Sequence, residues 1–174
     1  MYLVSIYFDD STHQKIQKYI NKVAEYTGNS TMTDGCVPPH ITISAFETLD
    51  EAKAIKALER AAARLKRDRL SWVSVGAFFP NVIYLTPVLN IYLHEMSKVV
   101  YEELLKVDGI KISSYYRPHG WLPHTTIGKK LTEEDMKVAF DVLQKSFGMF
   151  EGEVVKMGLA KPNPHRDIAT WSLE

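Results

Sequence analysis

The feature of this sequence that most constrains its fold is a partial repeat of the chain at an offset of about 82 residues. A constant offset across a whole chain is the signature of a duplicated unit. We therefore expect a single domain over residues 1–174 that consists of two pseudo-symmetric halves, about 1–81 and 82–174. The matching positions are Tyr2-Leu3 with Tyr84-Leu85, Leu49 with Leu131, Glu51 with Glu133, Ala57 with Ala139, Val73 with Val155, Gly76 with Gly158, and Pro80-Asn81 with Pro162-Asn163.

Each half is expected to run strand, helix, strand, helix, strand, because its apolar residues alternate between strand and helix periodicity. In the first half the expected strands are 2–8, 37–46 and 70–79, Asp10 or Ser11 could cap the first helix, and Asp50 opens the second. In the second half the expected strands are 82–87, 124–129, 153–159 and 168–173. Thr132 and Asp135 resemble a capping box for a helix whose Phe140 should point inward.

The charge balance excludes one broad class of function. Lys and Arg total 21, as do Asp and Glu, so the formal net charge is zero. A protein that binds duplex DNA through its phosphates usually carries a surplus of cations. We therefore expect no duplex DNA partner, and a neutral protein suits a short ligand better than a long one.

Composition and cysteine usage describe an ordinary globular chain. It is 45% hydrophobic and contains no apolar run of the roughly 20 residues that cross a bilayer, so no membrane association is expected. The single cysteine, Cys36, cannot form an intramolecular disulfide, which favours a reducing, cytoplasmic location. We expect a monomer.

Two short segments are near copies of one another: Pro39-His40-Ile41-Thr42-Ile43 and Pro123-His124-Thr125-Thr126-Ile127. Because side chains alternate faces along a strand, the His and the Thr of each segment should point the same way, about 6.6 Å apart. An approximate two-fold between the halves would bring the two strands together. Two imidazoles and two hydroxyls would then converge on one polar site.

Such a site suits attack on a phosphodiester, particularly a cyclic one. Imidazole can be neutral or protonated near neutral pH, so His40 and His124 can serve as general base and general acid. The hydroxyls of Thr42 and Thr126 can donate to the non-bridging phosphate oxygens. The scheme requires no metal and no cofactor.

Other interpretations of the two motifs stay open. One copy alone would more often be a half-exposed strand with a structural histidine. The pair could also hold a nucleotide or RNA end without turnover. A metal site at His40 and His124 is less favoured, because neither motif contains a carboxylate or a cysteine and catalytic zinc usually takes three protein ligands.

The paired motifs, their spacing and the order of elements resemble the two-histidine (2H) phosphoesterase superfamily, which includes the 2'-5' RNA ligase-like proteins. The resemblance implies a bilobed, internally duplicated α+β fold, with two antiparallel sheets flanking a central cleft and helices on the outside. It also implies metal-independent hydrolysis of a cyclic nucleotide or an RNA end with a cyclic phosphate or 2'-5' linkage, possible reverse ligase activity, and His40 as the acid and His124 as the base.

Residues around the second motif are candidates for substrate binding. Tyr116 and Trp121 could stack on a base, and Arg117 could pair with a phosphate, although Tyr and Trp also commonly pack between lobes. Lys129 stands where many relatives have an arginine; a lysine has no planar fork for bidentate phosphate binding, which speaks against a long RNA substrate.

Several other residues are assigned structural roles. The cations between Arg60 and Arg69 are expected at a helix C-terminus, with an RNA-backbone patch as the alternative. Core packing is expected for Phe46, Phe78 and Phe79, and surface or loop roles for His13, His94, His119 and His165, of which only His119 should lie near the site.

Overall fold

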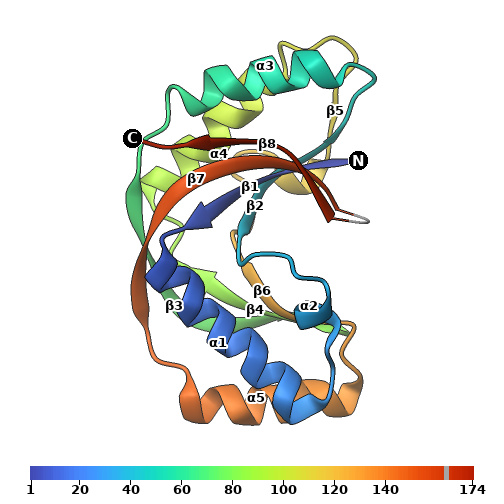
Figure 1. The fold of residues 1–174 in the computed structure, drawn as a ribbon, viewed down its shortest axis with the longest axis vertical. Coiled ribbons are helices and arrows are strands. Elements are labelled where there is room, and N and C mark those ends of the chain that lie inside the picture. Colours follow the sequence, from blue (N-terminus) through green and yellow to red (C-terminus); the bar gives the residue numbers. More distant parts are fainter. Residues whose placement is uncertain (163–164) are drawn as a thin grey trace.

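The computed structural model describes residues 1–162 and 165–174, which form an α+β fold (Figure 1). Asn163, one member of the sequence repeat, lies outside the described residues. The elements are β1 (Tyr2–Phe8), α1 (Asp10–Thr27), α2 (Thr31–Asp34), β2 (Ile41–Glu47), α3 (Glu51–Ala62), β3 (Asp68–Phe78), β4 (Val82–Pro87), α4 (Ile91–Leu104), β5 (Lys111–Ile112), a 3-10 turn η1 (Ser114–Tyr116), β6 (Thr125–Lys129), α5 (Glu133–Ser146), β7 (Phe150–Pro162) and β8 (His165–Ser172).

The strands form one connected antiparallel sheet rather than the two sheets expected. Its order is β5-β2-β1-β7-β3-β4-β6, and β8 also pairs with β7. The reason is the length of β7: its first residues, Phe150 to Val154, pair with β3, and the stretch from Val154 to Ala160 pairs with β1. A single 13-residue strand thus joins the two parts of the sheet.

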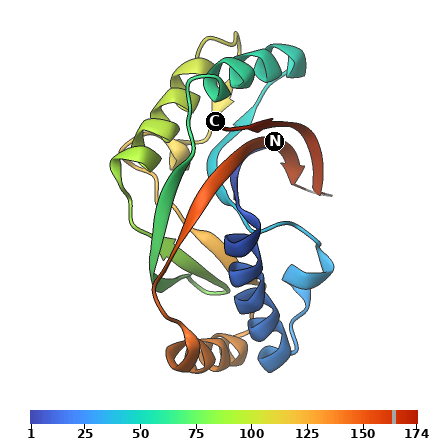
Figure 2. The ribbon, with the colours of Figure 1, turned by 60° about the vertical axis from the view of Figure 1, so that its left-hand side comes forward.

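The helices cover the sheet in two pairs at opposite ends of the molecule (Figures 1 and 2). Helices α3 and α4 pack on each other, and contact β8 and β2 respectively, whereas α1 and α5 pack on each other and contact β6 and β4. Helix α1 therefore covers strands from the other half of the chain. None of the helices among residues 1–162 and 165–174 has the length and apolar character needed to cross a bilayer.

The strand register relates the two motifs to their neighbours in the same way. Thr42 pairs with Ser5, which pairs with Gly158, and Thr126 pairs with Tyr84, which pairs with Gly76. Ser5 therefore occupies the position in the first half that Tyr84 occupies in the second. The sequence repeat had aligned Tyr2 with Tyr84, so that alignment was wrong by three residues. Gly76 and Gly158 do occupy matching positions. Internal duplication itself stays a prediction.

Helix ends follow the expected capping chemistry closely. Asp9, one residue before the expected caps, accepts from the backbone N–H of Thr12, and Gly28 ends α1 in the left-handed conformation. The Thr132–Asp135 capping box of α5 is confirmed. Phe140 is 36% exposed, so its predicted inward orientation was wrong. The short elements α2, β5 and η1 were not predicted.

The basic stretch after Arg60 is partly used to join two helices. The buried carboxylate of Glu103 on α4 accepts from Arg60 Nε at 3.0 Å, Arg64 Nη1 at 3.0 Å and Lys106 Nζ at 2.6 Å. These cations, with the hydrogen bond from Lys106 the largest influence, lower the pKa of Glu103 to about 2. Arg60 and Arg64 therefore hold α3 against α4, which accounts for their charge without an RNA ligand.

Candidate active site

Each motif histidine lies immediately before a strand and not within it as expected. Strand β2 begins at Ile41 and β6 at Thr125, because the two residues before each strand include a proline, which lacks a ladder donor. The Nδ1 atom of His40 lies 2.8 Å from the carbonyl oxygen of Pro38, and Nδ1 of His124 lies 2.9 Å from that of Leu122. A carbonyl only accepts, so Nδ1 donates in both rings and each Nε2 is left free for chemistry.

The surroundings of both histidines favour the neutral form of the ring. Burial lowers the pKa of His124 below its ordinary value, against a smaller opposing effect of the Leu122 carbonyl. Burial also lowers the pKa of His40, and the positive charges of His165, His124 and Lys129 lower it further.

A pocket of about 280 Å³ adjoins His40. Its polar lining consists of Ser5, Tyr7, His40, Thr126, Lys129 and His165, and its remaining walls are aliphatic. No acidic residue lines it among the residues that the structure describes. The pocket is therefore suited to an anionic group attached to a compact, partly apolar one.

His124 does not line this pocket, although Thr126 of the same motif does, and its ring lies in an aromatic setting. Its ring meets Phe78 edge to face, with centroids 4.8 Å apart, and lies 5.3 Å from Tyr84. The prediction of core packing was wrong for Phe78 and Phe79, which are 40% and 83% exposed because the end of β3 runs to the surface, and was confirmed for Phe46.

Thr42 does not line the pocket, but it contacts Ser5, which does. It is buried, and its hydroxyl lies 3.4 Å from that of Ser5. The indole N–H of Trp121 donates to the carbonyl oxygen of Thr42 at 3.1 Å, and Trp121 is only 7% exposed. The expected stacking of a base on Trp121 was therefore wrong, since its ring is packed in the core and its polar atom is already used.

The other candidates for substrate binding are divided. Lys129 lines the pocket, and its role in substrate binding stays a prediction. Tyr116 is partly buried against the core, and burial raises the pKa of its hydroxyl. Arg117 is exposed and lies outside the pocket lining, so the structure does not bring it to His40.

Three polar residues of the pocket were missed by the sequence reasoning. Ser5 and Tyr7 were assigned only to a buried strand, although their period-two spacing could have placed them on one face. His165 was assigned to the surface, and nothing in its local sequence indicates otherwise. His119 instead packs against His94, with ring centroids 4.3 Å apart.

The described residues contain no cluster of side chains that could bind a metal ion. Nowhere in residues 1–162 and 165–174 do three or more His, Cys, Asp or Glu side chains converge to hold an ion.

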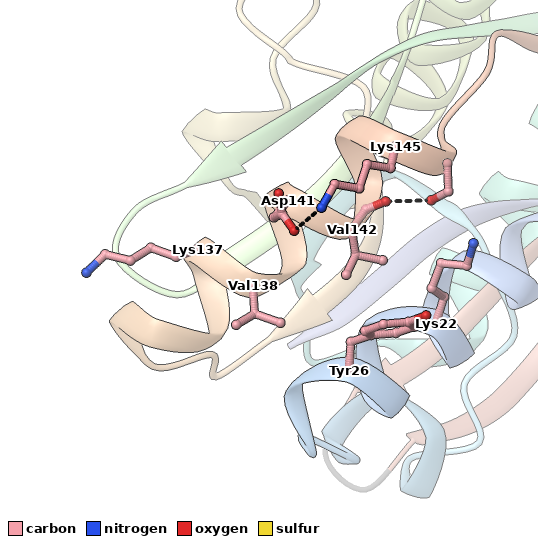
Figure 3. Close-up of a pocket in the computed structure, with 8 residues that line it drawn as sticks. Lys22, Tyr26, Lys137, Val138, Asp141, Val142 and Lys145 are labelled. Atoms are coloured by element: carbon pink, nitrogen blue, oxygen red, sulfur yellow. Dashed lines mark hydrogen bonds and ion pairs between the residues drawn. The ribbon is translucent and has the colours of Figure 1, made fainter.

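A hollow larger than the pocket at His40 lies between α1 and α5 (Figure 3). It measures about 680 Å³, and its walls include Lys22 and Tyr26 from α1 and Asp141 and Lys145 from α5. Lys145 is already paired with Asp141 at 2.7 Å. Neither motif contributes to this hollow, so its size does not make it the reaction site.

The fold and the paired motifs define a phosphoesterase-like class of protein, and the comparisons identify the family. Residues 9–166 match the model of the 2'-5' RNA ligase superfamily, and the chain belongs to that family. No curated protein sequence matches it.

Solved structures share its fold along almost the whole chain. The crystal structure of E. coli LigT complexed with 3'-AMP has a TM-score of 0.65 and 15% identity, covering 99% of this chain and 97% of that one. A structure described as a phosphoesterase has a TM-score of 0.64 and 16% identity, with coverage of 99% and 97%. Kluyveromyces marxianus Usb1 has a TM-score of 0.50 and 12% identity, with coverage of 99% and 96%. The antiparallel α+β fold expected from the resemblance is thus confirmed.

Proposed function

We propose that the protein is a metal-independent phosphoesterase that opens a cyclic phosphodiester on a nucleotide or RNA end. The observation that carries the proposal is the matched setting of His40 and His124, each with Nδ1 on a carbonyl two residues back and Nε2 free. Membership in the 2'-5' RNA ligase superfamily supports the reaction class, and 3'-AMP in the related LigT structure supports a nucleotide as the ligand.

In the proposed reaction a water oxygen attacks phosphorus while the bond from phosphorus to one ribose oxygen breaks. The neutral histidine takes a proton from the water at Nε2, and the protonated one gives a proton to the departing oxygen. The family resemblance assigns the acid to His40 and the base to His124. The hydroxyl of Thr126, in the pocket wall, and that of Thr42, beside Ser5, donate to the non-bridging oxygens as their charge grows.

The cations around His40 fit an anionic substrate. In the free protein, Lys129 and His165 disfavour a proton on His40. A bound phosphate offsets these charges, so substrate binding itself restores the proton affinity that an acid at His40 needs. Lys129 then serves as a phosphate ligand and not only as a repulsive neighbour.

The substrate is expected to be short. The pocket of about 280 Å³ is near the lower limit of ordinary ligand sites, which run from about 300 Å³ upward. The zero net charge likewise speaks against a long nucleic acid and against duplex DNA. We propose that a monomer acts in the cytoplasm, where the exposed free thiol of Cys36 would stay reduced.

The test is an assay of nucleoside 2',3'-cyclic phosphates, cyclic-phosphate RNA ends and 2'-5' linked oligonucleotides in the presence of EDTA. His40→Ala and His124→Ala should each lower kcat/KM by about 10²- to 10⁴-fold. His13→Ala, on α1 and outside the pocket lining, is the matched control. No turnover of any substrate at any pH, with 3'-AMP still bound, would select a nucleotide-binding module instead.

A further inference from the structure

The sheet places different side chains beside the two motif histidines at matching positions. Strand β1 pairs Ser5 with Gly158 and Leu3 with Ala160. Strand β4 pairs Tyr84 with Gly76 and Val82 with Phe78. Ser5 and Tyr84 occupy matching positions, because each pairs with the threonine of a motif. Their partners Gly158 and Gly76 therefore match as well. Two residues further along each partner strand, Ala160 matches Phe78.

Beside His124 these positions are filled by aromatic rings. Phe78 and Tyr84 lie 4.4 Å apart, and both rings contact His124. Beside His40 the same positions hold a hydroxymethyl and a methyl group, and the pocket lies there, with Ser5 and Ala160 in its lining. The ring of Tyr7 also lies beside His40, with centroids 6.2 Å apart, but it comes from the position on β1 two residues after Ser5 and itself lines the pocket. The pocket thus exists where two small residues replace two aromatic ones.

Strand β8 adds a polar wall on this side. It pairs with β7 and brings His165 into the pocket lining. The Nε2 atom of His165 is buried and has no hydrogen-bond partner among the described residues, although Asp167 Oδ1 lies 3.3 Å away. A buried polar atom without a partner is costly unless a ligand satisfies it.

We propose that Ser5, Ala160 and His165 make the His40 side a specificity subsite for the nucleoside attached to the reacting phosphate. This proposal rests on the proposed function and adds the orientation of the bound substrate. The nucleoside lies on the side of the phosphate that faces β1, β7 and β8, and not on the side of Phe78 and Tyr84. Its polar atoms, those of the base and the 5' oxygen, meet Ser5 and His165, and its apolar edge meets Leu3 and Ala160. The volume admits one terminal nucleoside and not an internal stretch of an oligonucleotide.

The experiment compares two cyclic phosphodiesters, a nucleoside 2',3'-cyclic phosphate and ethylene phosphate, which has the same ring and no nucleoside. The measured quantity is the ratio of their kcat/KM values. Ala160→Phe copies the side chain at the matching position and should lower this ratio by about tenfold or more, because remote binding energy is lost only for the larger substrate. Ala160→Val should lower it less, and His165→Ala should lower it by about fivefold or more.

Ala63→Phe, at an exposed position after α3, is the control for added bulk. Thermal unfolding of each variant separates misfolding from lost specificity, and the milder Ala160→Val keeps the test valid if Ala160→Phe does not fold. A ratio unchanged in both Ala160→Val and His165→Ala would overturn the subsite.

Failure of the proposed function gives a different result. In that case the wild-type protein opens neither substrate, and the subsite is tested by equilibrium binding of 3'-AMP. Weaker binding in Ala160→Val and His165→Ala than in Ala63→Phe would support it, and equal binding in all of them would overturn it.

Discussion

The ring of Tyr84 lies against the main chain of Gly76. A Cβ atom at Gly76 would stand 2.5 Å from Cε2 and 2.7 Å from the hydroxyl oxygen of Tyr84, closer than real contacts allow. The same ring packs against His124, with centroids 5.3 Å apart. Glycine at this position therefore lets the tyrosine lie flat on β3 and support the histidine. Tyr7 also lies close to a glycine, since a Cβ at Gly158 would be 2.8 Å from its Cε2, although Tyr7 stands two residues after Ser5, the position that matches Tyr84.

Gly76→Ala should displace Tyr84 and, through it, His124. Small misplacements of a catalytic group can cost about 100-fold, so we expect kcat/KM to fall by roughly 10- to 100-fold. Gly148→Ala is the control, because a Cβ there meets nothing within 4 Å. Equal activity of the two variants, both folded by circular dichroism, would show that Tyr84 does not position His124.

The pH dependence of activity should be shifted toward acid. The pKa values of His40 and His124 are both lowered from 6.5, mainly by burial. The neutral form of both rings is therefore favoured in the free protein, and the protonated partner becomes scarce at a lower pH than for a free imidazole. A bell-shaped profile of kcat/KM, which reports the free enzyme, should have its maximum below pH 6.5. A maximum at pH 7.5 or above would contradict the shifted values.

Local sequence patterns predicted most of the fold and the centre of the candidate site. Strands β1 and β4 have the expected bounds, and the Asp50 and Thr132 caps begin α3 and α5. These features depend on neighbours within a few residues. The motif histidines were found because the motif occurs twice.

What the sequence did not predict depends on pairing between distant segments. The double pairing of β7, the pocket at Ser5 and Ala160, and the arrival of His165 from β8 all follow from strand register. A shift of a few residues in register changes which side chains meet. The alignment of Tyr2 with Tyr84 contained such a shift. It therefore did not indicate that Ser5 lies beside the first motif.

Trp121→Phe should cost stability rather than substrate affinity. The indole N–H of Trp121 donates to the Thr42 carbonyl in the core, and its loss leaves that oxygen short of a partner at a cost of about 1–3 kcal/mol. Urea denaturation measures the loss. Trp171→Phe, a partly buried tryptophan on β8, is the matched control. A large fall in 3'-AMP affinity without a change in unfolding free energy would restore the stacking role.

Glu103→Gln should destabilise the protein in a way that depends on pH. Its pKa, lowered from 4.5 to about 2, means that the stabilisation is complete above pH 4.5 and is lost as pH falls toward 2. At pH 7 we expect the free energy of unfolding to fall by roughly 2–3 kcal/mol. Breaking a fully buried ion pair costs roughly 3–5 kcal/mol, and the loss here is smaller because Arg60, Arg64 and Lys106 are half exposed. Glu102→Gln, beside Arg64 at 3.9 Å and 45% exposed, should cost less than about 1 kcal/mol. Urea denaturation of all three proteins between pH 3 and 7 should show the wild-type advantage over Glu103→Gln shrinking with acid, and a constant difference would contradict the role of Glu103 as the charged link between α3 and α4.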